Sequence, residues 1–166
     1  MVKVLVSDPI HEDGVKILRE AGHTVDLRTE ITAEELKKVV EGYDAVVLRS
    51  RTKLTAEVLE KADRLKAIAR AGVGLDNIDT IYAEERGIEV FNSPEAPCNT
   101  VAELVIGLML SMARHISVAD STMKQGRWEK NRLTGIELSG RTLGVIGFGR
   151  IGYTVGKKAR ALGWRS

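Results

Sequence analysis

The first hundred residues alternate short apolar runs with segments of helical periodicity. Apolar runs of strand length predict strands at Val2–Ser7, His23–Leu27, Asp44–Arg49, Leu65–Ala71 and Ile88–Phe91. Helices are predicted between them, over Asp13–Ala21, from Thr32 to Gly42, from Thr55 onward and over Ile78–Arg86. Strands that alternate with helices imply βαβ crossovers. The pattern therefore predicts an α/β fold with a parallel sheet covered on both faces.

The pattern changes at Asn92–Pro97, where two prolines and a serine are typical of a linker. Thr100 and Glu103 have the spacing of a capping box, which predicts a helix over Val101–Ala113. This helix is apolar on nearly every face, so we expect it to be buried all round, between two domains or two subunits. A strand at Thr142–Ile146 and a final helix to about Leu162 follow.

Composition limits the class of protein. The chain is 43% hydrophobic and 29% charged, and its net charge of +2 comes from scattered basic residues, which argues against nucleic acid or a membrane surface as its partner. No run approaches the ~20 apolar residues of a membrane-spanning helix. The single cysteine, Cys98, cannot form an internal disulfide, which favours a reducing compartment. We expect a cytoplasmic protein without a metal site.

A glycine-rich turn lies between the last predicted strand and helix. Gly147, Gly149 and Gly152 fit the pattern G-x-G-x-x-G. In this pattern the first glycine permits a tight turn, the second lets the backbone approach a pyrophosphate, and the third lets helix and strand pack closely. The acidic residue that would read the adenosine ribose is expected about 20 positions later, past Ser166. These residues therefore do not distinguish NAD from NADP.

Four segments together resemble one family. They are Arg49–Lys53, Arg70–Asp79, Asn92–Glu103 and Leu143–Gly152, in the order and spacing of the D-isomer-specific 2-hydroxyacid dehydrogenases, and of the phosphoglycerate dehydrogenases among them. The resemblance implies a flavodoxin-like parallel-sheet substrate domain over residues 1–97, followed over residues 98–166 by the start of a Rossmann NAD-binding domain. It also implies NAD as the cofactor.

The resemblance assigns binding roles to residues of both parts. Arg49 and Lys53 would hold a substrate phosphate, although Arg49 could instead pair with a neighbouring carboxylate. The backbone N–H groups of the loop formed by Gly72, Val73 and Gly74 would receive the substrate carboxylate. The cofactor would contact Gly147, Gly149, Arg150, Ile151 and Gly152.

No catalytic residue is carried over, because the family's catalytic arginine, glutamate and histidine lie further along the NAD-binding domain. His11, His23 and His115 match none of those positions, and a surface or helix-end role is the simpler interpretation for each.

The function implied is the NAD-dependent oxidation of a D-2-hydroxyacid, with 3-phosphoglycerate converted to 3-phosphohydroxypyruvate in serine biosynthesis. We expect these 166 residues alone to be inactive. The alternatives are a glyoxylate or hydroxypyruvate reductase and a non-catalytic NAD-sensing module. A phospho-accepting receiver domain is rejected because Arg49 and Ser50 follow the third strand, where a receiver needs an aspartate. We also expect a homodimer formed through the Val101–Ala113 helix.

Overall fold

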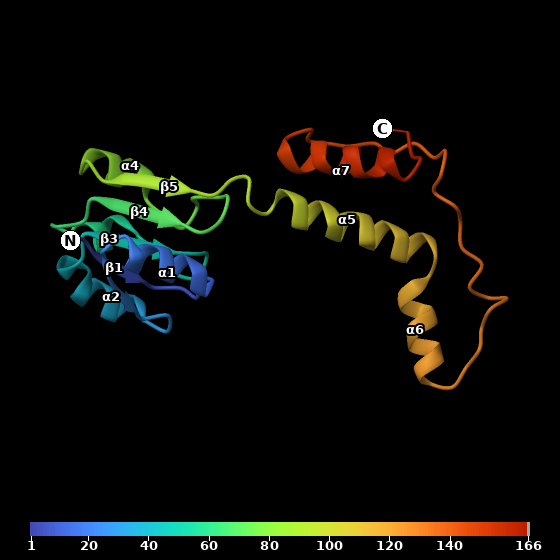
Figure 1. Cartoon of the computed structure of the whole chain (residues 1–166), viewed down its shortest axis with the longest axis horizontal. Coiled ribbons are helices and arrows are strands. Elements are labelled where there is room, and N and C mark those ends of the chain that lie inside the picture. The colour runs from blue at the N-terminus through green and yellow to red at the C-terminus, as the bar shows by residue number, and fades with distance from the viewer. Residues whose placement is uncertain (166) are drawn as a thin grey trace. The chain divides into compact units, whose positions relative to one another are not determined.

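A computed structural model of the chain describes residues 1–165 and divides them into two units, Met1–Pro94 and the part that begins at Glu95. The first unit contains a five-stranded sheet (Figure 1). Its strands are β1 (Lys3–Val6), β2 (Thr24–Leu27), β3 (Ala45–Leu48), β4 (Ala67–Arg70) and β5 (Glu89–Asn92). All pairs are parallel, in the order β2-β1-β3-β4-β5. This order is flavodoxin-like, and it confirms the predicted α/β fold.

Helices connect the strands as the pattern predicts. They are α1 (Glu12–Glu20), α2 (Ala33–Val39) with the short 3-10 helix η1 (Val40–Gly42), α3 (Ala56–Leu59) and α4 (Thr80–Glu85). The capping box at the start of α2 is present, because Thr32 and Glu35 bind each other's backbone N–H groups. Leu5, Val46 and Ile68 lie in one core cluster with side chains of α2, α3 and α4. Figure 1 shows α1 on the other face of the sheet.

The second unit consists of three helices and a long irregular segment. The helices are α5 (Cys98–Ala113), α6 (Ile116–Lys124) and α7 (Arg150–Ala161). α5 and α7 lie side by side (Figure 1), with a core formed by Ala102 and Ile106 against Val155, Ala159 and Trp164. Among the described residues, no single helix is long and apolar enough to cross a membrane. α5 and α6 pass that test only when taken together, and they are bent by 67°.

Two expectations for this second unit are wrong. α5 begins at Cys98, so Thr100 lies inside the helix and does not cap it. Pro97 occupies the cap position and is compatible with the start of a helix. The carboxylate of Glu103, predicted to complete the capping box, instead binds Lys158 at 3.1 Å and Asn99 at 2.9 Å. In the single chain Leu108 and Met112 of α5 are 55% and 78% exposed, so burial of this helix between two domains or two subunits stays a prediction.

The second error concerns the strand predicted at Thr142–Ile146, which does not form. Only an isolated parallel bridge joins Thr142 to Arg165, and the side chain of Ile146 is fully exposed. A strand needs a partner whose N–H and C=O groups complete its ladder, and the described residues supply that partner at one position only. α6 was not predicted, whereas α7 matches the final helix expected from the pattern.

Candidate functional site

Two loops of the first unit emerge at the same edge of the sheet. The segment Arg49–Lys53 follows β3, and the loop Gly72–Gly74 follows β4. β3 and β4 are hydrogen-bonded neighbours whose last residues, Leu48 and Arg70, are register partners. Ligands of open parallel sheets bind at this carboxyl edge. The structure therefore brings together the five residues predicted to hold a substrate.

The two predicted phosphate ligands have free cationic groups. Arg49 and Lys53 are exposed, and within residues 1–165 neither side chain forms a hydrogen bond or an ion pair. Arg49 takes part only through its backbone. The alternative in which Arg49 pairs with a neighbouring carboxylate is not what the structure shows. Both side chains are thus available to an anion.

Arg51 lies between these two residues and has a different role. Its guanidinium donates to the carbonyl oxygens of Ser7, Thr29 and Ile31, and it lies 3.0 Å from a carboxylate oxygen of Asp8. These contacts occupy its donors within the protein. Of the three cations in this short segment, only Arg49 and Lys53 remain available to a ligand.

The carbonyl groups of the Gly72–Gly74 loop are all occupied. The carbonyl oxygen of Gly72 accepts a hydrogen bond from the backbone N–H of Ser93 at 2.9 Å and a longer one, at 3.4 Å, from the Ser93 hydroxyl. The carbonyl oxygen of Val73 accepts from the side-chain amide of Asn92 at 2.6 Å. The carbonyl oxygen of Gly74 accepts from the guanidinium of Arg70, whose side chain is 10% exposed. The acceptors of this loop are therefore satisfied internally.

Two of the three backbone donors of the same loop are open, whereas the N–H of Gly72 donates to the carbonyl oxygen of Arg70 at 2.8 Å. Within the described residues, the backbone N–H groups of Val73 and Gly74 have no hydrogen-bond acceptor. A Cβ added at Gly74 would lie 2.7 Å from a carboxylate oxygen of Asp76, an exposed side chain that can move. Two unpaired N–H groups beside satisfied carbonyls form a short stretch of partial positive charge, which suits a carboxylate. Val73 and Gly74 thus have donors free for a carboxylate, whereas the N–H of Gly72 is already bound, and the role of the loop stays a prediction.

Asp8 is a residue of this edge that the sequence reasoning missed. It follows β1 and is 1% exposed. Burial alone would raise the pKa of its carboxyl group, but hydrogen bonds from Arg49 and Thr52 and the nearby charge of Arg51 outweigh this and lower the pKa. The carboxylate therefore stays ionised. A polar residue directly after a buried strand, at the edge where Arg49 lies, is the signal that could have identified it.

In the second unit, the glycine-rich turn has the geometry that its pattern requires. Gly147 has a φ of +86°, a conformation that favours glycine. A Cβ added at Gly152 would lie 2.4 Å from the carbonyl oxygen of Gly147 and 3.1 Å from Cγ1 of Val145. The third glycine of the pattern is thus needed for close packing of the helix against the turn, as expected.

The N-terminus of α7 is open to an anion. Gly149 is its cap residue and forms no side-chain capping hydrogen bond, and the first turn carries no acidic residue. The first N–H groups of a helix lack internal partners and carry partial positive charge. Arg150 makes only a 3.8 Å contact with the exposed Glu95, and Ile151 packs against the α5–α7 core. The turn and helix end therefore fit a pyrophosphate group.

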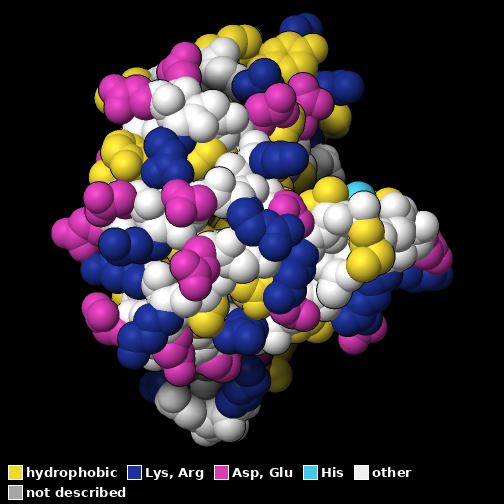
Figure 2. Space-filling model, turned by 90° about the vertical axis from the view of Figure 1, so that its left-hand side faces the viewer, with side chains coloured by type: hydrophobic (Ala, Val, Ile, Leu, Met, Phe, Trp, Pro, Cys, Tyr) yellow, Lys and Arg dark blue, Asp and Glu magenta, His cyan; other side chains and the backbone are white. Residues whose placement is uncertain are grey.

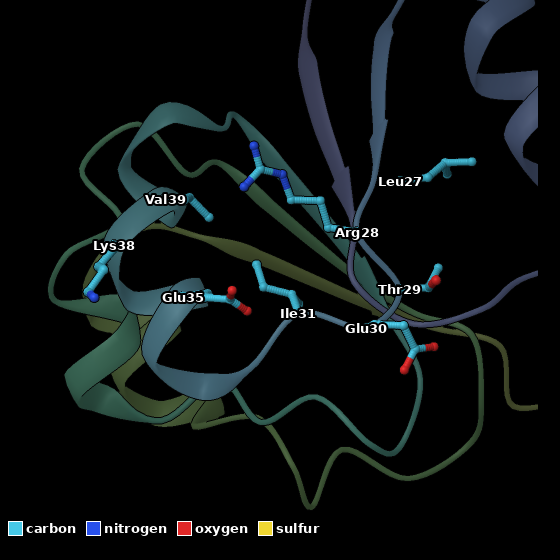
Figure 3. A pocket seen from close by; sticks show the side chains of 8 residues that line it. All are labelled: Leu27, Arg28, Thr29, Glu30, Ile31, Glu35, Lys38 and Val39. Carbon is cyan, nitrogen blue, oxygen red and sulfur yellow. The ribbon is translucent and has the colours of Figure 1, made fainter.

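A hollow of about 500 Å³ lies beside the loop that follows β2 (Figure 3). It is lined by Leu27, Arg28, Thr29, Glu30, Ile31, Glu35, Lys38 and Val39. None of the predicted site residues lines it. The carboxylate of Glu35 is already bound to Thr32 in the capping box, and these hydrogen bonds lower its pKa. We assign no ligand to this hollow.

Charged side chains are mixed over the surface. On the face drawn in Figure 2, lysine and arginine lie among aspartate and glutamate, so the basic residues there are not gathered into one patch. Among residues 1–165, no group of three or more histidine, cysteine, aspartate or glutamate side chains could hold a metal ion.

Comparison with known proteins gives consistent matches. The family model for the catalytic domain of D-isomer specific 2-hydroxyacid dehydrogenase matches residues 4–161. A D-3-phosphoglycerate dehydrogenase of Methanocaldococcus jannaschii is 54% identical over 98% of the chain, and a hydroxypyruvate reductase of Thermotoga maritima is 46% identical over 98% of it. The NAD+-bound 3-phosphoglycerate dehydrogenase of Entamoeba histolytica superposes with a TM-score of 0.75 at 32% identity, over 99% of the chain.

The chain is shorter than these relatives. It covers 31% of the Methanocaldococcus protein, 53% of the Thermotoga protein and 52% of the Entamoeba structure.

Proposed function

Because the chain belongs to the D-isomer-specific 2-hydroxyacid dehydrogenases, we propose that it forms the substrate-holding part, and the start of the cofactor-holding part, of an NAD-dependent enzyme. The proposed reaction is the oxidation of 3-phosphoglycerate to 3-phosphohydroxypyruvate in serine biosynthesis. In this proposal residues 1–97 are the substrate domain and residues 98–166 are the first part of the NAD-binding domain.

The pairing of free cations with free N–H groups carries the proposal. Arg49 and Lys53 offer two unpaired positive groups on one loop, and Val73 and Gly74 offer two unpaired N–H groups on the next. A 3-phosphoglycerate molecule has a phosphate at one end and a carboxylate at the other. The cations suit the phosphate, and the N–H groups suit the carboxylate. Bound in this way, the substrate would be held at both ends with its C2 carbon between them.

The glycine-rich turn supports NAD as the cofactor. Gly147, Gly149, Arg150, Ile151 and Gly152 would hold its pyrophosphate, through the open N–H groups at the start of α7. When bound, NAD supplies the acceptor for the hydride that leaves C2. The contribution of these residues is to fix the phosphate end of that cofactor.

The general base is not among the histidines of this chain, in our interpretation. His11 caps α1, and His115 is the cap residue of α6 with a φ of 54°. His23 directly precedes β2, at the opposite edge of the sheet from Arg49. We therefore expect residues 1–166 to bind substrate without turning it over. Incubation with NAD and 3-phosphoglycerate should give no NADH absorbance above a control without protein. A measurable turnover would contradict this expectation.

A binding experiment tests the substrate. The Arg49→Gln variant should bind 3-phosphoglycerate at least tenfold more weakly, because a hydrogen bond to a charged group contributes about 1.5–3 kcal/mol. The control is Arg64→Gln, which removes a charge of the same unit that is paired with Asp44. Affinities would be measured by titration calorimetry. Equal affinities for the two variants would exclude Arg49 as a phosphate ligand.

The similarity to a hydroxypyruvate reductase supports a second candidate, reduction of hydroxypyruvate. That substrate has a carboxylate but no phosphate, so it would use the N–H groups of Val73 and Gly74 without needing Arg49. Wild-type protein that binds glycerate as tightly as 3-phosphoglycerate would favour this candidate over the first.

We also propose that the chain forms a homodimer through the predicted Val101–Ala113 helix. Leu104, Leu108 and Met112 are 62%, 55% and 78% exposed. Their spacing of four residues places them on one face of α5. An exposed apolar stripe of this kind is typical of an interaction surface, and a second copy would cover it with the same helix.

A further inference from the structure

Asp8 is a buried carboxylate to which the proposed function gives no role. Its oxygens accept the backbone N–H of Arg49 at 2.6 Å and that of Thr52 at 3.2 Å. They also accept the hydroxyl of Thr52 at 2.8 Å. Asp8 therefore binds the first and the fourth residue of the segment that follows β3. The guanidinium of Arg51, 3.0 Å away, compensates the buried charge.

Asn77 binds the same two residues through their carbonyl groups. Its side-chain amide donates to the carbonyl oxygen of Arg49 at 2.7 Å and to that of Thr52 at 2.6 Å. Asn77 is 8% exposed and lies at the end of the Gly72–Gly74 loop region. The backbone of Arg49 and Thr52 is thus fixed at both its N–H and its C=O groups. Irregular backbone held in this way loses most of its freedom to rearrange.

We propose that Asp8 is a positioning residue for phosphate binding. It fixes the backbone from which the side chains of Arg49 and Lys53 reach the ligand, and it contacts no ligand itself. The inference rests on the proposed function, in which these two cations hold the substrate phosphate. Fixing the segment in advance removes part of the ordering cost that binding would otherwise carry. Loss of Asp8 should therefore weaken the binding of a phosphorylated ligand while both cations remain present.

The test compares Asp8→Asn with Asp44→Asn in the chain of residues 1–166. Asp44 is a matched control, because it also accepts a backbone N–H, from Lys3 at 2.8 Å, and an arginine, Arg64 at 2.9 Å. It directly precedes β3, at the opposite edge of the sheet from Arg49. Affinities for 3-phosphoglycerate and for glycerate, which lacks the phosphate, would be measured at a temperature where every variant is folded.

We expect Asp8→Asn to weaken the binding of 3-phosphoglycerate about tenfold and to leave the affinity for glycerate within about twofold of wild type. It should also accelerate amide hydrogen exchange at Arg49 and Thr52. Asp44→Asn should leave the affinity for both ligands unchanged. Equal losses for both ligands, or no loss in Asp8→Asn, would overturn the positioning role. If the wild-type chain binds 3-phosphoglycerate no better than glycerate, the proposed function fails, and this inference fails with it.

A second pair of variants covers the case in which Asp8→Asn does not fold. Thr52→Val keeps the shape of a buried side chain and removes one hydrogen bond to Asp8, whereas Thr52→Ser keeps the hydroxyl donor. Thr52→Val should weaken the binding of 3-phosphoglycerate about threefold, and Thr52→Ser should retain the wild-type affinity. Wild-type affinity in Thr52→Val would count against the proposal.

Discussion

Replacement of Gly152 by alanine tests why the third glycine of the turn is needed. The added Cβ would lie 2.4 Å from the carbonyl oxygen of Gly147. Ordinary contacts between nonbonded heavy atoms are about 3.5–4.0 Å, so the carbonyl would have to move by about 1 Å. Gly147 holds a tight turn with a φ of +86°, and its carbonyl cannot move without opening that turn. The variant should therefore be destabilised.

The magnitude follows from two opposing terms. Overpacking of this kind costs about 1–3 kcal/mol, and we take the upper value because the obstructing atom is backbone. Alanine gains about 1 kcal/mol over glycine in a helix interior, and less in the first turn, where Gly152 lies. The expected net loss is about 2–3 kcal/mol. Gly107→Ala is the matched control, since nothing lies within 4 Å of its Cβ in the middle of α5, and it should gain about 1 kcal/mol.

Tryptophan fluorescence can follow this unit alone, because both tryptophans of the chain, Trp128 and Trp164, belong to it. Trp164 is 7% exposed and packs with Ala159 of α7, so its emission should shift when the unit unfolds. Urea titrations of the two variants and the wild type give the free energies of unfolding. If Gly152→Ala is as stable as Gly107→Ala, the steric explanation of the third glycine is wrong.

Three further predictions concern assembly and stability. Leu108→Glu should convert a dimer to a monomer in sedimentation velocity, because it places a charge on the exposed apolar face of α5; a dimer that persists would exclude this face. The lowered pKa of Asp8 means that its stabilising contribution is present above the ordinary value of 3.8 and is lost as pH falls through its folded pKa. The stability difference between wild type and Asp8→Asn, measured by circular dichroism in urea, should therefore shrink as the pH falls below 3.8. Tyr43→Phe should cost about 1 kcal/mol in the same assay, since the hydroxyl donates to Asp26 at 2.9 Å.

The strands and helices of the first unit could be predicted because their signals are local. Each strand is a short apolar run, and α2 begins at a capping box whose two members are three residues apart. The same reasoning was wrong at Thr100 and Glu103, which have capping-box spacing but lie inside α5. The carboxylate of Glu103 is bound to Lys158, 55 positions away, and no local pattern contains that partner.

The strand expected at Thr142–Ile146 shows the other limit of local reasoning. Its composition suits a strand, but a strand is stable only when a neighbour completes its hydrogen bonds and covers its side chains. In the structure only Thr142 has a bridge partner, and Ile146 is fully exposed. The composition of the segment therefore indicates that it is able to form a strand, whereas the hydrogen-bond partners available to it determine whether the strand forms.

The sequence could predict a cationic segment for phosphate binding, but it could not predict which of its cations are bound within the protein. Arg49, Arg51 and Lys53 look equivalent in the sequence, yet Arg51 is turned toward carbonyl groups and toward Asp8, 43 positions earlier. One buried carboxylate compensates one of the three cations. Two positive charges then remain for a ligand, close to the charge of about −1.5 to −2 that a phosphate monoester carries at neutral pH. On this argument Asp8 sets the net charge offered by the segment as well as its backbone position.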